Sequence, residues 1–176
     1  FMWAISIIKD TANWKKTTNP MQLTYLPTGQ IIYFRGGDEP EKIKSIKPPF
    51  GHIAYVWFEE VDQFKGGEQI RNIKQSAIRG GDEGLIFKSY NTPRSKAHWI
   101  NKFVKTPQPN MYVHHSSYLE APSEWLGQFF LDEADLLRET NEKAYKHEYL
   151  GEEVGDGSNV FDNVVAREFS DDEILN

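Results

Sequence analysis

Cysteine is absent from the 176-residue sequence, which excludes a disulfide framework and a zinc site built on cysteine ligands. No apolar run approaches the roughly 18 residues of a membrane-spanning helix, so no membrane association is expected. Basic residues are outnumbered, with 20 Lys and Arg against 26 Asp and Glu and a net charge of −6. Any contact with nucleic acid therefore has to come from a local basic patch on an acidic body. The lack of cysteine also favours a reducing, cytosolic compartment.

The hydrophobic fraction of 39% is enough for one domain with a real core. Residues 1–16 have apolar side chains near helical spacing and predict a helix that ends at Asn19-Pro20. The segments MQLTYLP and QIIYFRG, on either side of Thr28-Gly29, alternate β-favouring residues and predict a hairpin. Further helices are predicted over 68–79, 95–104 and 123–148.

Two segments have the pattern of buried strands. The run HIAYVWF (52–58) is nearly continuous in apolar residues, which predicts burial on both faces, and GLIFKSY (84–90) is similar. Residues 112–115 predict a third strand. Strands that alternate with helices indicate an α/β domain with a mainly parallel sheet. Chemistry in such sheets gathers at the carboxyl ends of the strands, which here carry Glu59-Glu60 and Ser89-Tyr90-Asn91.

An apolar strand that ends in two adjacent acids is the arrangement that nucleotide hydrolysis requires. The first acid, Glu59, would hold Mg²⁺ through water, and the second, Glu60, would polarise the attacking water. Ser89, Tyr90 and Asn91 would sense whether the γ-phosphate is present. Each feature also has a simpler interpretation, namely two solvated acids that open a turn and an ordinary Asn-Thr-Pro turn.

Five segments lie in an order and spacing that point to a family. They are IIYFRGGDEPEKIKSI, HIAYVWFEEVDQF, LIFKSYNTP, HHSSYLEAP and YLGEEVG with VFDNV. The chain resembles the large terminase subunits of tailed phages and prophages over nearly its whole length, most specifically in DEPEKIKSI, YVWFEE and SYNTP. The resemblance implies a sheet of the P-loop NTPase (ASCE/RecA-like) type, incomplete at the N-terminus. It makes YVWFEE the Walker B strand, Glu59 the Mg²⁺ acid, Glu60 the catalytic glutamate and Ser89-Tyr90-Asn91 the coupling motif.

The same resemblance implies an organisation and a set of partners. Residues 1–122 would be a partial P-loop ATPase core, 123–150 a helical lid subdomain and 151–176 a linker toward an absent nuclease domain. The implied function is an ATPase motor that translocates double-stranded DNA into the procapsid during viral genome packaging. ATP and Mg²⁺ would be its ligands. A portal protein, a small terminase subunit and further copies in a ring would be its partners, in the host cell cytoplasm.

One departure from the family pattern concerns the phosphate-binding loop. No G-x-x-x-x-G-K-[ST] occurs, and none of the pairs Gly36-Gly37, Gly66-Gly67 and Gly80-Gly81 is followed by the required Lys. The nuclease acids of the family are also missing. We therefore expect the chain to be an interior slice of a longer protein, and by itself to bind ATP weakly or not at all.

Several basic residues are candidates for contact with DNA phosphates or with the nucleotide of a neighbouring subunit. They are Arg35, Lys42, Lys44, Arg71 and Arg79. A solvated basic face is the alternative for each. The five tryptophans are predicted to lie in the core. For the whole chain, the alternative to a motor is a non-catalytic α/β domain that docks DNA or partners, while a helicase would require further motifs that we do not find.

Overall fold

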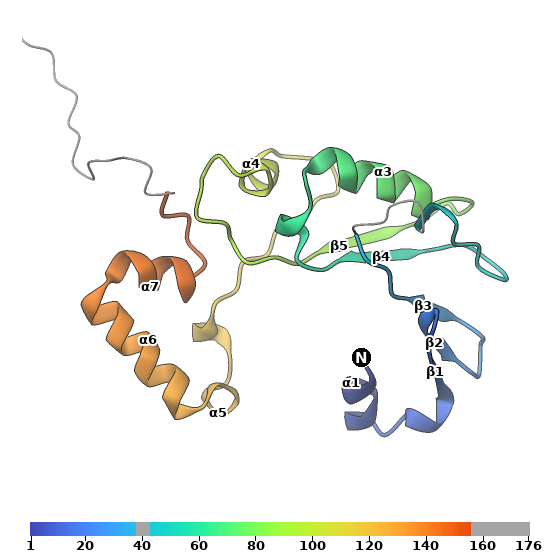
Figure 1. Cartoon of the computed structure of the whole chain (residues 1–176), viewed down its shortest axis with the longest axis horizontal. Helices are drawn as coiled ribbons and strands as arrows, with labels where there is room; N and C mark the ends of the chain where they lie inside the picture. The colour runs from blue at the N-terminus through green and yellow to red at the C-terminus, as the bar shows by residue number, and fades with distance from the viewer. Residues whose placement is uncertain (38–42, 156–176) are drawn as a thin grey trace, which may run out of the picture. The chain divides into compact units, whose positions relative to one another are not determined.

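The structure is a computed structural model and describes residues 1–37 and 43–155 (Figure 1). The chain divides into two compact units, Phe1–Tyr90 and Asn91–Asn176. Within the described residues, no helix is both long and apolar enough to cross a membrane. The boundary between the units falls inside the predicted coupling motif, directly after Tyr90.

The first unit begins with a short helix and an antiparallel sheet. The sheet has three strands in the order β1-β2-β3. Strands β2 and β3 form the hairpin that the sequence predicts, with Gln22 opposite Tyr33. The bounds are α1 Met2–Ile7, η1 Thr11–Asn13, β1 Trp14–Thr18, β2 Met21–Tyr25 and β3 Ile31–Tyr33.

The helix predicted over residues 1–16 is wrong beyond Ile7. The end of this range forms strand β1, which pairs with β2 along its whole length. Trp14 packs on Tyr25, with ring centroids 5.0 Å apart. These long-range contacts outweigh a weak local preference for a helix, which the β-branched Thr17-Thr18 lowers further.

A parallel pair of strands, β4 and β5, is connected through helix α3. This β-α-β connection is the one that the alternating pattern predicts, and α3 lies along one side of the pair (Figure 1). Helix α3 buries Ile70, Ile73 and Ala77, whose spacing places them on one face of the helix. The bounds are β4 Tyr55–Phe58, η2 Val61–Gln63, α3 Gly67–Ala77 and β5 Leu85–Lys88.

The other side of the parallel pair is exposed, so the predicted burial on both faces is wrong for the described residues. Tyr55, Trp57, Leu85 and Phe87 share one side through the parallel register and are 46–71% exposed. Two strands form here rather than a broad sheet, and no described element is placed so as to bury these side chains. We call these four residues the open apolar face.

The second unit is helical. Helices occupy most of the predicted ranges 95–104 and 123–148, whereas the strand predicted at 112–115 is wrong. Tyr112 is 86% exposed, and within the described residues this segment pairs with no strand. An extended pattern without a ladder partner does not form a stable strand. The bounds are α4 Trp99–Lys105, η3 Tyr118–Glu120, α5 Ser123–Leu126, α6 Gln128–Thr140 and α7 Glu142–Glu148.

Four aromatic side chains hold η3 against α6 and α7. The Tyr118 ring makes edge contacts with Phe130, Tyr145 and Tyr149, at centroid distances of 5.6, 6.4 and 5.7 Å. The hydroxyls of Tyr118 and Tyr145 also form a hydrogen bond of 2.9 Å. We call these four residues the aromatic cluster, and they fix the path of the chain into the helices.

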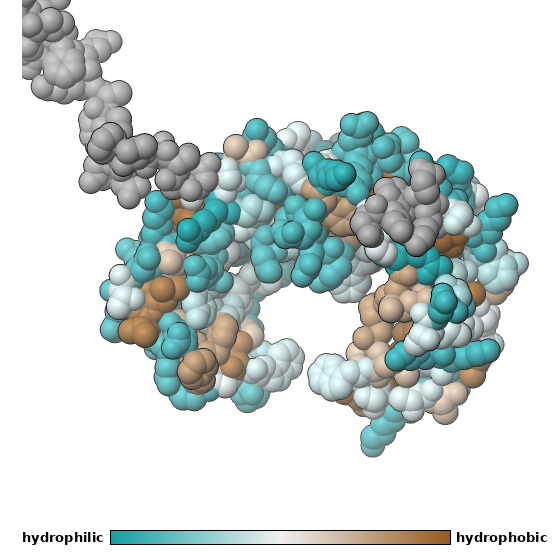
Figure 2. All heavy atoms as spheres, viewed as in Figure 1, coloured by the Kyte–Doolittle hydropathy of each residue, from teal (hydrophilic) through white to brown (hydrophobic). Residues whose placement is uncertain are grey.

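Apolar side chains also reach the surface, and Figure 2 shows them over α5 and α6. Three of the tryptophans contradict the prediction that all five lie in the core. Trp3, Trp57 and Trp125 are 61–78% exposed. Trp14 and Trp99 are half-buried.

The mixed α/β class is confirmed, with one parallel and one antiparallel sheet. The described residues do not form a mainly parallel sheet, because three of the strands belong to the antiparallel one. The predicted boundaries 1–122, 123–150 and 151–176 stay predictions, and residues 156–176 lie outside the described residues.

Candidate active site

Strands β4 and β5 end side by side. Their parallel register pairs Phe58 with Lys88, so both carboxyl ends lie at the same end of the sheet. The Ser89 N–H donates to the Phe58 carbonyl and the Val61 N–H donates to the Ser89 carbonyl, both at 3.0 Å. Glu59 is thereby brought next to Ser89, from a position 30 residues earlier in the chain. This adjacency is the one that the sequence predicts.

The Ser89 hydroxyl acts both as a donor and as an acceptor. Its Oγ donates a hydrogen bond of 2.6 Å to Glu59 Oε2 and accepts one of 2.9 Å from Trp57 Nε1. A hydroxyl bonded to a carboxylate at this length is charge-assisted and roughly twice as strong as a neutral pair. The bond directs Glu59 Oε2 toward β5 and leaves Oε1 for another ligand.

Glu60 has left-handed backbone torsions, with φ 49° and ψ 50°. A residue with a Cβ adopts this conformation at a cost of roughly 1–2 kcal/mol. The torsions turn the chain out of the strand direction, so that Val61 is fully buried and the Gln63 N–H donates to the Glu60 carbonyl at 2.9 Å. Backbone strain of this kind concentrates at functional sites.

The electrostatics of the strand ends combine two exposed acids with a partly buried cation. Glu59 and Glu60 are both exposed to solvent. Burial, and then the charge of Lys74 on α3, lower the pKa of the Lys88 amine from its ordinary value. Lys88, whose amine is partly desolvated, directly precedes Ser89 in the sequence, and Ser89 carries the hydroxyl that bonds to Glu59.

The other two members of the predicted coupling motif lie on either side of the boundary between the units. Tyr90 is half-buried at the end of the first unit, and Asn91 is exposed at the start of the second. Ser89 is the member whose side chain contacts Glu59. The motif therefore follows β5 directly and forms the covalent connection of the units.

The oxygen donors at the strand ends fit a magnesium ion held through water. Mg²⁺ usually keeps several waters and is bound through one or two carboxylates together with substrate phosphates. Glu59 offers Oε1 in a fixed orientation, and it is exposed to solvent. Among the described residues, no three His, Asp or Glu side chains cluster as a complete metal cage would require.

Two of the predicted basic residues, Arg35 and Arg71, lie beside the antiparallel sheet and on α3. The Arg35 Nη1 donates to the carbonyls of Met21 (3.2 Å) and Phe34 (2.7 Å), beside the antiparallel sheet. Arg71 is exposed on α3. Lys42 lies outside the described residues. Their predicted contacts with DNA or with a neighbouring subunit stay predictions.

Lys44 and Arg79 line one hollow of about 300 Å³. Lys47 and His52 also line it, and we call these four residues the basic hollow. Arg79 Nε donates to the Gln75 carbonyl at 3.0 Å, so the hollow adjoins the carboxyl end of α3. Glu60 precedes the other end of α3, which is roughly 15 Å long at 1.5 Å per residue. Lys44 and Arg79 therefore do not reach Glu60 within one chain.

Known proteins identify the family. A family model described as phage terminase large subunit matches residues 1–152. The chain belongs to this family. It is similar to a protein of Bacillus phage SPP1 named "Terminase, large subunit", with 39% identity over 171 residues, or 94% of this chain. The match covers 40% of that relative, so the chain spans about two fifths of its length.

Three residues that the structure singles out in this terminase chain were not predicted from its sequence. Lys47 and His52 complete the basic hollow, and their signal was the run of cations that begins before β4. Asn101 is the one polar residue buried among the described residues, with 1% of its surface exposed. In WINKFV it follows Ile100 and precedes the charged Lys102, so no local pattern in the sequence marks it as buried.

Proposed function

We propose that this chain is part of the ATP-hydrolysing motor of a phage DNA-packaging terminase, with a P-loop NTPase core. In this proposal, ATP hydrolysis is coupled to translocation of double-stranded DNA into the procapsid. The observation that carries it is the bond from Ser89 to Glu59 where two parallel strands end, with Glu60 as the next residue. In α/β proteins, nucleotides bind at the carboxyl ends of the parallel strands, and carboxylates at these ends take part in hydrolysis.

Each residue at the strand ends has a role in the proposed reaction. Glu59 holds Mg²⁺ through water, and Ser89 keeps its carboxylate in one orientation. The ion, when bound, neutralises charge on the phosphate oxygens. Glu60, the next residue, which has left-handed backbone torsions, orients the attacking water and accepts its proton. Ser89, Tyr90 and Asn91 pass the change at the γ-phosphate into the second unit.

Nucleotide binding in this proposal requires a segment that the chain does not contain. No G-x-x-x-x-G-K-[ST] occurs in the sequence, so a Walker A segment has to come from elsewhere in the protein. Reading the gene upstream of Phe1 should reveal this motif. The proposed partners are double-stranded DNA, a portal protein, a small terminase subunit and further copies in a ring, in the host cell cytoplasm.

The first prediction concerns Glu60 in the full-length terminase subunit. Glu60→Gln keeps the shape of the side chain and removes the group that accepts the proton. We expect ATP hydrolysis to fall by about 100-fold or more, because general-base catalysis contributes 10²–10⁴-fold. ATP affinity, measured by calorimetry, should stay close to that of the unchanged protein. Glu68→Gln, the same change at an exposed acid in the first turn of α3, is the control.

Undiminished turnover in Glu60→Gln would remove Glu60 from its proposed role.

A second candidate function is a non-catalytic domain that docks DNA or partners. The open apolar face favours it, because large exposed apolar patches mark interaction surfaces. A full-length protein that binds DNA and does not hydrolyse ATP would support this candidate instead.

A further inference from the structure

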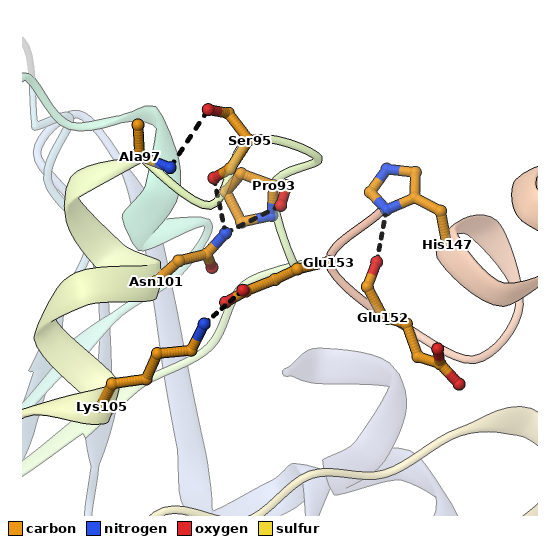
Figure 3. A network of polar contacts seen from close by, with 8 residues as sticks. All are labelled: Pro93, Ser95, Ala97, Asn101, Lys105, His147, Glu152 and Glu153. Atoms are coloured by element: carbon orange, nitrogen blue, oxygen red, sulfur yellow. Dashed lines mark hydrogen bonds and ion pairs between the residues drawn. The ribbon is translucent and has the colours of Figure 1, made fainter. Parts of the chain in front are cut away.

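The loop after the coupling motif is held by one buried side chain. Asn101, on α4, points its amide group at this loop (Figure 3). Its Nδ2 donates to the Pro93 carbonyl at 2.8 Å and to the Ser95 carbonyl at 2.9 Å. Asn101 is 1% exposed, and its Oδ1 is buried without a partner. The buried amide therefore serves as a donor to two carbonyls of the loop.

The same loop is stiffened from within. Pro93 has a fixed φ and restricts Thr92 before it to extended torsions. The Ser95 Oγ accepts a hydrogen bond of 3.2 Å from the Ala97 N–H, which stiffens the loop just before α4. The two bonds from Asn101 hold this loop to α4 at two of its residues, Pro93 and Ser95, rather than at one.

A second segment of the same unit also contacts this loop. The Gly155 N–H donates to the Arg94 carbonyl at 3.0 Å, and the Arg94 guanidinium lies 3.7 Å from Glu148 at the end of α7. Lys105 on α4 forms an ion pair with Glu153 (Figure 3). The loop after the coupling motif therefore contacts both α4 and the segment that leaves the helices of the second unit.

We infer that Asn101 is a positioning residue for coupling, which anchors the coupling motif to the second unit. The inference rests on the proposed function. Ser89 is bonded to Glu59 at one end of the segment, and Pro93 is bonded to Asn101 at the other. The three residues between them span at most roughly 10 Å. A displacement of Ser89 is therefore transmitted to α4 instead of being absorbed by a loose loop.

The experiment uses the full-length terminase subunit with its packaging partners. Asn101→Leu keeps the branched shape and the number of side-chain heavy atoms, removes the Nδ2 donor and also removes the unpartnered Oδ1. Asn101→Ser is a second variant, smaller and polar, for the case that Leu prevents folding. Lys102→Gln, at the next and exposed position of α4, is the control. The measurements are the rate of ATP hydrolysis, the length of DNA packaged per ATP, and amide hydrogen exchange over residues 92–96.

Loss of the anchor should separate hydrolysis from packaging. We expect hydrolysis to stay within about threefold of the unchanged protein, DNA packaged per ATP to fall at least about fivefold, and amides 92–96 to exchange faster. Lys102→Gln should change none of these. Unaltered packaging per ATP in both Asn101 variants would overturn the inference. A parallel loss of hydrolysis and packaging would also overturn it, because such a loss indicates a merely structural role for Asn101. An unchanged protein that does not hydrolyse ATP would instead overturn the proposed function, and the inference with it.

Discussion

Ser89 is the residue through which the two strand ends are joined. Its backbone bonds to Phe58 and Val61, and its hydroxyl bonds to Glu59 and Trp57. The backbone bonds do not depend on the side chain, whereas the orientation of Glu59 does. Substitution of this side chain therefore tests orientation separately from the pairing of the strands.

The prediction at the residue scale compares Ser89→Ala with Ser89→Thr in the full-length protein. Ala removes the donor to Glu59, so the carboxylate loses its fixed orientation. We expect ATP hydrolysis to fall by roughly tenfold, which corresponds to about 1.4 kcal/mol in the barrier. Thr keeps a hydroxyl at the same position and should retain most of the activity. Equal rates in the Ala and Thr variants would show that orientation by Ser89 does not matter.

The residues of the strand ends could be predicted because each follows an apolar run in the sequence. To predict where Glu59, Glu60 and Ser89 lie, it is enough to know that the carboxyl ends of parallel strands lie at the same edge of a sheet. Asn101 could not be predicted, since its role depends on carbonyls that a folded loop presents to it. His52 could not be placed either, because its neighbours in the basic hollow come from separate elements.

At the scale of elements, local patterns predicted the hairpin and the helices of the second unit. The local patterns failed where a tertiary contact determines which secondary structure forms. Strand β1 forms because it pairs with β2, although its sequence lies in a range with helical spacing. Residues 112–115 have a strand pattern and no described strand to pair with. The exposed side of β4 and β5 shows that an apolar run predicts a strand but not what covers it.

The aromatic cluster gives the helical unit a dependence on alkaline pH. The hydrogen bond with Tyr145, and then burial, raise the pKa of the Tyr118 hydroxyl to about 12. An unfolded tyrosine titrates near about 10. The folded state therefore favours the neutral hydroxyl. The stabilisation is fully present below pH of about 10 and is lost as the pH rises through about 12.

The prediction at this scale concerns Tyr118→Phe. The change leaves the hydroxyl of Tyr145, which is 7% exposed, without its partner. We expect the free energy of unfolding near pH 8 to fall by about 1–2 kcal/mol, measured by urea unfolding with circular dichroism. Near pH of about 11 the difference from the unchanged protein should shrink, because Tyr118 in the unfolded chain is then mostly ionised while the folded hydroxyl, with a pKa of about 12, is still mostly neutral.

Tyr112→Phe is the control for this prediction, since Tyr112 is 86% exposed and lies outside the aromatic cluster. It should change the stability at neither pH. A difference between Tyr118→Phe and the unchanged protein that stays constant from pH 8 to 11 would contradict the assigned titration.

For the whole molecule, the net charge of −6 opposes binding to DNA. Affinity for DNA then depends on cations that are gathered in one place. The basic hollow is such a place, because Lys44, Lys47 and Arg79 lie around about 300 Å³. A competing explanation is that Arg79 serves the carboxyl end of α3, where a cation offsets the helix dipole and bonds the Gln75 carbonyl. The two explanations predict different effects of substitution.

The prediction for the whole molecule is tested with Lys47→Gln and Arg79→Gln. If the hollow holds a DNA phosphate, each change should weaken binding to duplex DNA and reduce the slope of log affinity against log salt by about 0.9. The measurement is a salt titration of the affinity for a duplex without sequence preference. Lys15→Gln, the same change at an exposed lysine of β1, should leave the slope unaltered. If Arg79 only caps α3, Arg79→Gln will lower the thermal stability, and the salt slope will stay that of the unchanged protein. This result would show that the assignment of the basic hollow to DNA is wrong.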